Sequence, residues 1–312
     1  MKNIKNLTFL PFFLILLISI DCLQPLSNCK KGEFIMFTPH KTEVISLFSD
    51  RPNITLTTYV AGTHPALPFN NKRKAILILP GGGYTACAAI ESEPIAHHFL
   101  ASGFNAFILE YTTLATGSPL WPTPLVDASA AMKYIRDHAE ELHVDPDNVF
   151  VIGFSAGGHL AASLGTMWDN DEIEALLSME KGYNRPTGMI LSYAVTSIDV
   201  HGHKSSFQKI LGNNRDPEAE RAVSPDYQVS EKTVPAFIWH TRTDEGVSVR
   251  HALVFAKKLT DYNIPFEMHI YPDGKHGVSL CNEIVDRYYP AVNDWTRDSV
   301  RWMNQIASKP SN

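Results

Sequence analysis

Residues 148–160, NVFVIGFSAGGHL, place a serine between glycines directly after an apolar run. A short run rich in Val and Ile predicts a buried strand, and GFSAG fits the G-x-S-x-G pattern of a nucleophile elbow. In that turn Ser155 exposes its hydroxyl, while Gly153 and Gly157 avoid side chains that would collide as strand and helix pack closely. In the alternative, Ser155 merely begins a helix. Because the pattern arises by chance in roughly one chain of this length in ten, other residues must supply the remaining groups.

Asp244 and His276 are the candidates for these groups, since each follows a strand-like apolar run, as Ser155 does. A serine hydroxyl is a weak nucleophile until a base removes its proton, and neutral imidazole does this near physiological pH. A carboxylate orients the imidazole and stabilises the imidazolium that forms. The order Ser, Asp, His along the chain therefore predicts covalent acyl transfer. Two alternatives stay open: Asp244 caps the following helix while Glu245 is the acid, or His276 is a solvated loop residue.

Three consecutive glycines, Gly81 to Gly83, follow another apolar run in the segment LPGGGYTAC. Acyl transfer needs hydrogen-bond donors for the negative oxygen of the tetrahedral intermediate, and we predict the amides of Gly82, Gly83 and Ala156 in this role. GGGYTA also fits the dinucleotide fingerprint G-x-G-x-x-G/A, with Glu110 as the ribose-binding acid. Glu110 follows Gly83 by 27 residues (83 to 110) instead of the usual spacing of about 20. Because a dinucleotide site also leaves the serine, aspartate and histidine unexplained, no cofactor is predicted.

The elements that must position these loops are strand-like runs alternating with helical patterns. Near-continuous apolar strands separated by helices predict an α/β fold with a mostly parallel sheet covered by helices on both faces. Ligands in such sheets bind beyond the carboxyl ends of the strands, where all four loops lie. The expected strands are 74–80, 104–111, 149–154, 188–193, 234–241 and 266–272, and the clearest helical patterns cover 124–142, 248–264 and 291–307.

Composition limits the classes of function. The chain has 312 residues, 44% of them hydrophobic, and shows no internal repeat or long linker, so one domain over residues 31–312 is expected. The formal net charge is −6 without a basic block, which argues against a nucleic-acid partner. The histidine pairs His97/His98 and His201/His203 lack further ligands at metal spacing, so no metal site is predicted.

The first 30 residues differ in kind from the rest. Two lysines precede LTFLPFFLILLISI, a 14-residue stretch that has the length of a signal-peptide core and is short for a membrane span. Residues 1–30 are therefore expected to be a signal peptide or an uncleaved N-terminal anchor, because Asp21 before Cys22 suits neither common signal peptidase. Either case predicts a protein outside the cytoplasm. Contact with a membrane is expected only through this segment, and only if it is not cleaved. Translation from Met36 would instead give a cytoplasmic protein.

Four cysteines lie in two groups. Cys22 and Cys29 are in or just after the leader, whereas Cys87 and Cys281 follow the glycine loop and the histidine loop. These two loops should meet at one face of the fold. We expect two buried thiols there, and a Cys87–Cys281 disulfide is the alternative in an exported protein.

With these residues assembled, the chain resembles the esterase branch of the α/β-hydrolases that includes bacterial acetylxylan and feruloyl esterases. The resemblance runs from about residue 74 to residue 303. It implies the α/β-hydrolase fold, with Ser155 as nucleophile, Asp244 as acid, His276 as base and the glycine loop as oxyanion loop. Pro80 is a departure, since related lipases and esterases often have His there. The motifs are PGGGY, EPIAHHFLASGFNAFILEY, PLVDASAAMKYIR, DPDNVFVIGFSAGGHLAASL, SPDYQVSEKTVPAFIWHTRTDEGV and YPDGKHG.

The sequence says less about the substrate. Residues 196–229 are the sizeable cap candidate, and their polar composition disfavours a lipid substrate. Tyr84 and Trp121 are candidate substrate contacts; the Trp121 ring can stack on a sugar, and its alternative role is to pack within a loop. Small acyl groups on a hydrated polymer, such as the O-acetyl groups of xylan or its oligosaccharides, fit best. Feruloyl esters, other short esters, a formamidase reaction and a non-catalytic carbohydrate-binding role are the alternatives.

Overall fold

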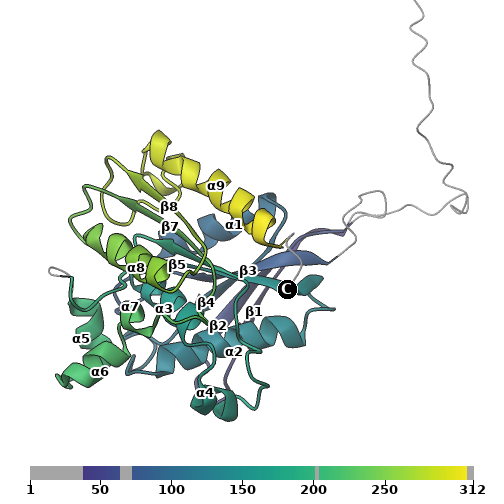
Figure 1. Cartoon of the computed structure of the whole chain (residues 1–312). Coiled ribbons are helices and arrows are strands. Elements are labelled where there is room, and N and C mark those ends of the chain that lie inside the picture. Colours follow the sequence, from purple (N-terminus) through teal and green to yellow (C-terminus); the bar gives the residue numbers. More distant parts are fainter. Residues whose placement is uncertain (1–37, 64–71, 201–203, 308–312) are drawn as a thin grey trace, which may run out of the picture. The chain divides into compact units, whose positions relative to one another are not determined.

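The computed structural model describes residues 38–63, 72–200 and 204–307, shown in colour in Figure 1. The predicted leader with Cys22 and Cys29, the alternative start at Met36 and the pair His201/His203 all lie outside the described residues. Within the described ranges, every helix is too short or too polar to span a lipid bilayer.

In the described part of the chain, eight strands form one sheet. They are β1 (Lys41–Ser46), β2 (Thr55–Val60), β3 (Arg73–Leu79), β4 (Asn105–Glu110), β5 (Val144–Phe154), β6 (Met189–Ser192), β7 (Ala236–Thr241) and β8 (Phe266–Tyr271). Their order across the sheet is β1-β2-β4-β3-β5-β6-β7-β8. β1 and β2 are antiparallel to their neighbours, whereas β4, β3 and β5 to β8 run parallel to one another. The carboxyl ends of the six parallel strands therefore lie along one edge.

All six predicted strands are confirmed, as β3 to β8. The sequence patterns missed β1 and β2 because neither is a continuous apolar run. β1 is an edge strand with most of its side chains exposed, and β2 alternates between buried and half-buried positions near its start. Strands that are not covered on both faces lack the apolar signal on which the prediction depended.

Helices cover both faces of the sheet (Figure 1). They are α1 (Glu93–Ala101), α2 (Thr123–Asp137), α3 (Ser155–Thr166), α4 (Asp171–Leu176), α5 (Ser205–Leu211), α6 (Pro217–Ala222), α7 (Pro225–Gln228), α8 (Arg250–Asp261) and α9 (Pro290–Ala307). Successive strand residues point to opposite faces. In β3, Ile76 and Ile78 pack with α1 and α9, whereas Leu77 and Leu79 pack with α2, α3 and α8. The fold class is thus the predicted one.

The three predicted helices are confirmed as α2, α8 and α9. α2 ends at Asp137, earlier than the pattern suggested, because the chain must turn back to begin β5 at Val144. About half of the cap candidate, residues 196–229, lies in the three short helices α5, α6 and α7. α6 has no buried residue, in keeping with the polar sequence of this segment.

Candidate active site

Ser155 lies where β5 ends and α3 begins. Its φ is +52°, a left-handed backbone conformation that is uncommon for a residue other than glycine, and its exposed fraction is 6%. A Cβ atom added to Gly153 would lie 2.1 Å from the Gly157 carbonyl oxygen, and one added to Gly157 would lie 2.0 Å from that of Leu79. Strand and helix therefore pack closely enough to require both glycines, as predicted. This tight turn presents the serine at the carboxyl edge of the sheet.

His276 joins Ser155 to Asp244. Its Nε2 atom lies 2.8 Å from Ser155 Oγ, and its Nδ1 atom lies 2.8 Å from Asp244 Oδ2. With the proton on Nδ1, the ring donates to the carboxylate and accepts from the serine hydroxyl. Glu245 is exposed and does not take this position. The structure thus brings together the three residues that the sequence analysis grouped, with Asp244 rather than Glu245 beside the histidine.

The loop around Asp244 holds its carboxylate in place. Oδ1 accepts hydrogen bonds of 2.8 Å from the amides of Gly246 and Val247, and His240 Nε2 lies 3.4 Å from Oδ2. Burial acts to raise the pKa of Asp244, but hydrogen bonds from His240, His276 and Val247 and the charge of His276 outweigh it and hold that pKa well below its usual range. Asp244 therefore stays ionised and available to His276.

The glycine loop, Gly81 to Gly83, lies beside these three residues, and its amides differ in whether they have a hydrogen-bond acceptor. The amide of Gly81 donates to a buried carboxylate, Glu91 Oε2, at 2.7 Å. Within the described part of the chain, the amides of Gly82 and Gly83 donate to no protein acceptor. Gly82 has a φ of +120°, and a Cβ there would lie 1.8 Å from the Ala86 carbonyl oxygen. The loop can accordingly offer two amides, while Ala156 is in the first turn of α3, where amides lack a partner within the helix.

Tyr84 and Trp121, the two predicted substrate contacts, have different outcomes. The Tyr84 side chain is fully buried, and its hydroxyl lies 2.7 Å from His159 Nδ1. It therefore links the end of the glycine loop to α3 and offers no surface to a ligand. The prediction that Tyr84 contacts substrate is corrected accordingly. Trp121 is half-buried, and its ring packs edge-on against His159 at 5.9 Å. Its contact with substrate stays a prediction.

Sequence reasoning missed several residues that support the site. His159, one helical turn after Ser155, also bonds the Val223 carbonyl through Nε2 at 2.7 Å, and burial lowers its pKa to about 4. It is therefore a neutral structural link. Lys209 of α5 donates to the Gly83 carbonyl and to Thr85 Oγ1, each at 2.8 Å. The spacing of His159 from the serine is the signal that could have identified it; Lys209 has none.

A hollow opens beside His276. Its volume is about 580 Å³, and it adjoins another of about 490 Å³ that shares Lys275, His276 and Tyr289 with it. Tyr288, on the wall of the smaller hollow, is 68% exposed. The remaining lining is mostly polar, of both charge signs: Thr243, Glu245, Gly246, Asp273, Gly274, Asp286 and Arg287.

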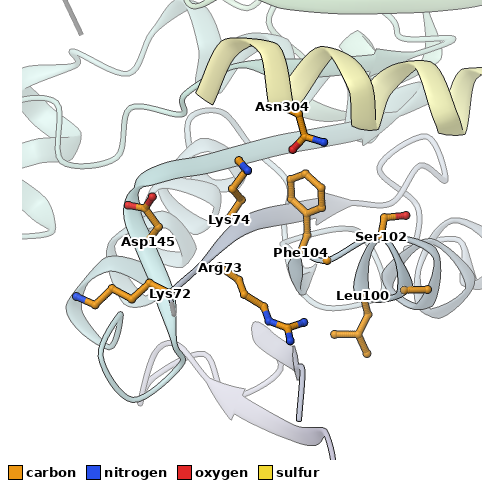
Figure 2. Close-up of a pocket in the computed structure, with 10 residues that line it drawn as sticks. Lys72, Arg73, Lys74, Leu100, Ser102, Phe104, Asp145 and Asn304 are labelled. Atoms are coloured by element: carbon orange, nitrogen blue, oxygen red, sulfur yellow. The ribbon is translucent and has the colours of Figure 1, made fainter. Parts of the chain in front are cut away.

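A third hollow, of about 740 Å³, lies at the other end of the parallel strands (Figure 2). Lys72, Arg73 and Lys74 line it at the start of β3, together with Asp145 near the start of β5. Its lining contains neither histidine nor cysteine. Since ligands in parallel sheets bind at the carboxyl ends of the strands, the hollow beside His276 is the candidate ligand site.

Cys87 and Cys281 are both free thiols. Burial raises the pKa of each thiol, that of Cys281 to about 12, so neither is a ready nucleophile near neutral pH. The Cys87 thiol acts against the rise in pKa that burial causes at Glu110, the residue that a dinucleotide site would need for a ribose. Among the described residues, no three His, Cys, Asp or Glu side chains gather closely enough to hold a metal ion.

Comparison with known proteins places this geometry in a family context. A family model described as BD-FAE matches residues 66–259. Over 217 residues, covering 68% of this chain, the sequence is 38% identical to endo-1,4-beta-xylanase B of Butyrivibrio fibrisolvens and 30% identical to an acetylxylan esterase of Xylanibacter ruminicola. The aligned part spans 33% and 42% of these two relatives, well under two thirds of their length.

Solved structures are similar over most of the chain. An acetyl ester-xyloside bifunctional hydrolase from Caldicellulosiruptor lactoaceticus has a TM-score of 0.72 and 33% identity, and the match covers 86% of this chain and 98% of that one. An α/β-hydrolase from a Medee basin deep-sea metagenome has a TM-score of 0.70 and 32% identity, with 87% and 100% covered. The fold of this chain is therefore that of the α/β-hydrolases.

Proposed function

Because the chain belongs to the BD-FAE family and has the α/β-hydrolase fold, we propose that it is a serine carboxylic-ester hydrolase acting through an acyl-enzyme. The observation that carries this proposal is the continuous hydrogen-bonded series Ser155–His276–Asp244 beside two free amides of the glycine loop. The dinucleotide alternative is disfavoured, since relatives of this chain are named as ester hydrolases.

The reaction would follow from this geometry in two halves. Ser155 Oγ attacks the ester carbonyl carbon while its proton passes to His276 Nε2, and Asp244 stabilises the imidazolium. The carbonyl oxygen becomes an oxyanion held by the amides of Gly82, Gly83 and Ala156. The intermediate collapses, the carbon–oxygen bond to the alcohol breaks, and His276 returns the proton to the departing oxygen. Water, activated by the same histidine, then releases the acid and restores the serine.

For the substrate we infer acetyl esters on xylan-type polysaccharides or their oligosaccharides. Relatives named as an acetylxylan esterase and as an acetyl ester-xyloside hydrolase support this choice. The alcohol must leave from the side of His276, and the hollow there has an exposed tyrosine and polar walls suited to a hydroxyl-rich group. Feruloyl esters, short-chain esters of small molecules and a formamidase reaction are the competing substrates.

A polymeric substrate also fits the predicted export. A polysaccharide is too large to enter a cell, so we propose that the protein works outside the cytoplasm, released or held by its N-terminal segment. Imported oligosaccharides would instead suit a cytoplasmic form that starts at Met36.

A product-release assay tests the substrate proposal. Acetylated xylan and feruloylated xylan are incubated with the purified protein, and acetate and ferulate are measured, with 4-nitrophenyl acetate as the activated control. Acetate release that disappears in Ser155→Ala supports the proposal. Ferulate release alone would identify a feruloyl esterase, and hydrolysis of the activated ester alone would point to small-molecule substrates.

A further inference from the structure

Glu91 is a buried carboxylate that the reaction steps above do not use. It ends a 3₁₀ turn, Ala89–Glu91, that follows the glycine loop, and its exposed fraction is 3%. Burying a carboxylate is costly unless hydrogen bonds replace its water. The hydrogen-bond partners of Glu91 therefore indicate what the residue does.

Both oxygens of Glu91 accept hydrogen bonds from neutral groups. Oε2 accepts from the Gly81 amide at 2.7 Å, and Oε1 accepts from the Tyr193 hydroxyl at 2.6 Å. The Tyr193 oxygen in turn accepts from the Ser279 amide at 3.1 Å. Because the hydroxyl proton is directed at Glu91, this arrangement suits a carboxylate that only accepts. Burial raises the pKa of Glu91, and the bonds from Tyr193 and Gly81 and the charge of His276 act against that rise.

The hydrogen-bonded series Gly81–Glu91–Tyr193–Ser279 begins in one loop of the active site and ends in another. Gly81 directly precedes the amides of the glycine loop, and a Cβ on Gly81 would lie 2.6 Å from Glu91 Oε2, so loop and carboxylate are in close contact. Ser279 follows His276 by three residues, and its hydroxyl donates to the Ile90 carbonyl. The Tyr193 ring also packs edge-on against the His276 ring, with centroids 5.1 Å apart.

We propose that Glu91 is a positioning residue that holds the glycine loop and the histidine loop at a fixed distance from each other, an inference that rests on the proposed esterase function. Ser155 must meet both the base and the oxyanion donors, and these come from loops nearly 200 residues apart in sequence, as the 189-residue separation of Ile90 and Ser279 illustrates. Productive geometry has a tolerance of about 0.5 Å. A shared carboxylate between the loops is a direct way to keep them within it.

Glu91→Gln is the central test because it keeps the shape and changes one acceptor into a donor. The amide NH₂ cannot face the Gly81 N–H, so it must face the Tyr193 oxygen, whose own proton then loses its acceptor. We expect kcat for 4-nitrophenyl acetate to fall by about 10- to 100-fold, since displacements near 1 Å can cost about 100-fold. KM should change by less than about threefold, because no substrate contact is removed.

Tyr193→Phe provides a second route that does not depend on the folding of the Gln variant. It removes only the hydrogen bonds of the Tyr193 hydroxyl, which connect Glu91 to the histidine loop, and leaves the bond from Gly81 to Glu91 intact. A smaller fall in kcat is therefore expected. The double variant should lose about as much as Glu91→Gln alone, because residues that act through one network are not additive.

Asp127→Asn is the matched control. Asp127 of α2 is also a fully buried carboxylate, and it accepts from Thr112 and Arg51 without bonding either active-site loop. It should lower the melting temperature yet leave kcat within about twofold. Wild-type kcat in Glu91→Gln, or a fall no larger than that of Asp127→Asn at equal loss of melting temperature, would overturn the inference. If the wild-type protein itself neither hydrolyses esters nor reacts with a fluorophosphonate, the proposed function has failed instead.

Discussion

Asp244→Asn is a sharp test of the proposed mechanism because the change is nearly isosteric. The Asn carbonyl oxygen can still accept from the amides of Gly246 and Val247, which fixes the side chain in its present orientation. Its NH₂ group then faces His276 Nδ1, where the carboxylate oxygen now lies at 2.8 Å. Two donors cannot share that contact, so the imidazole must carry its proton on Nε2 and can no longer accept the serine proton.

The size of the effect follows from the loss of that tautomer. Removing the orienting carboxylate costs on the order of 10³ to 10⁴ in kcat. At about 1.36 kcal/mol per factor of ten, this corresponds to about 4 to 5.5 kcal/mol of transition-state stabilisation.

The assay is steady-state hydrolysis of 4-nitrophenyl acetate, with the melting temperature measured in parallel to confirm folding. Glu245→Gln is the control, because Glu245 is exposed and makes no contact with the His276 ring nitrogens. It should keep nearly full activity. Full activity in Asp244→Asn together with a large loss in Glu245→Gln would refute the assignment of the acid.

Further expectations concern the nucleophile, the alcohol side, acid stability and export. A fluorophosphonate should label Ser155, and Ser155→Ala should abolish labelling and lose on the order of 10⁴ to 10⁶ in kcat; labelling of another serine would contradict the assignment. Tyr288→Ala should raise KM for acetylated xylo-oligosaccharides while leaving 4-nitrophenyl acetate unaffected, and equal effects on both would argue against a sugar contact. Because the pKa of Asp244 is lowered on folding, its stabilising contribution is present above the ordinary Asp pKa of about 3.8 and is lost as the pH falls below it. The difference in unfolding free energy between wild type and Asp244→Asn should therefore become smaller below about pH 3.8. A difference that stays constant with pH would count against the lowered pKa. N-terminal sequencing of native protein should find cleavage between about residues 20 and 30 or an intact anchor, whereas a cytosolic species starting at Met36 would exclude export.

The features of the fold and of the site that could be predicted from the sequence are those with a signal in a short stretch of residues. Ser155, Asp244 and His276 each follow a strand that the sequence predicts, and parallel strands bring their carboxyl ends to one edge, so three separate local patterns sufficed to group them. The glycine loop was identified by composition in the same way. Its inner geometry was not, because only the structure separates the Gly81 amide, which is bonded to Glu91, from the two that follow.

The failures concern contacts between residues far apart in sequence. Glu91 and Tyr193 are 102 residues apart, and neither lies in a motif that announces the bond between them. Tyr84 follows three glycines in an exposed-looking loop, yet its ring turns inward to His159, 75 residues away. Side-chain direction in a loop with positive φ values at Gly82, Gly83 and Tyr84 cannot be read from periodicity, since such a loop has none.

The distance along the chain between Ser155 and His276 also bears on how the protein is made. These residues are 121 positions apart, and the elements between them include β6, β7 and β8. At synthesis rates of about 5 to 20 residues per second, the histidine leaves the ribosome about 6 to 24 s after the serine. Under the proposed mechanism, the nascent chain holds the nucleophile without its base throughout that interval. Hydrolytic activity would therefore mark the completion of the sheet, and fragments ending before β8 would be inert whatever their stability.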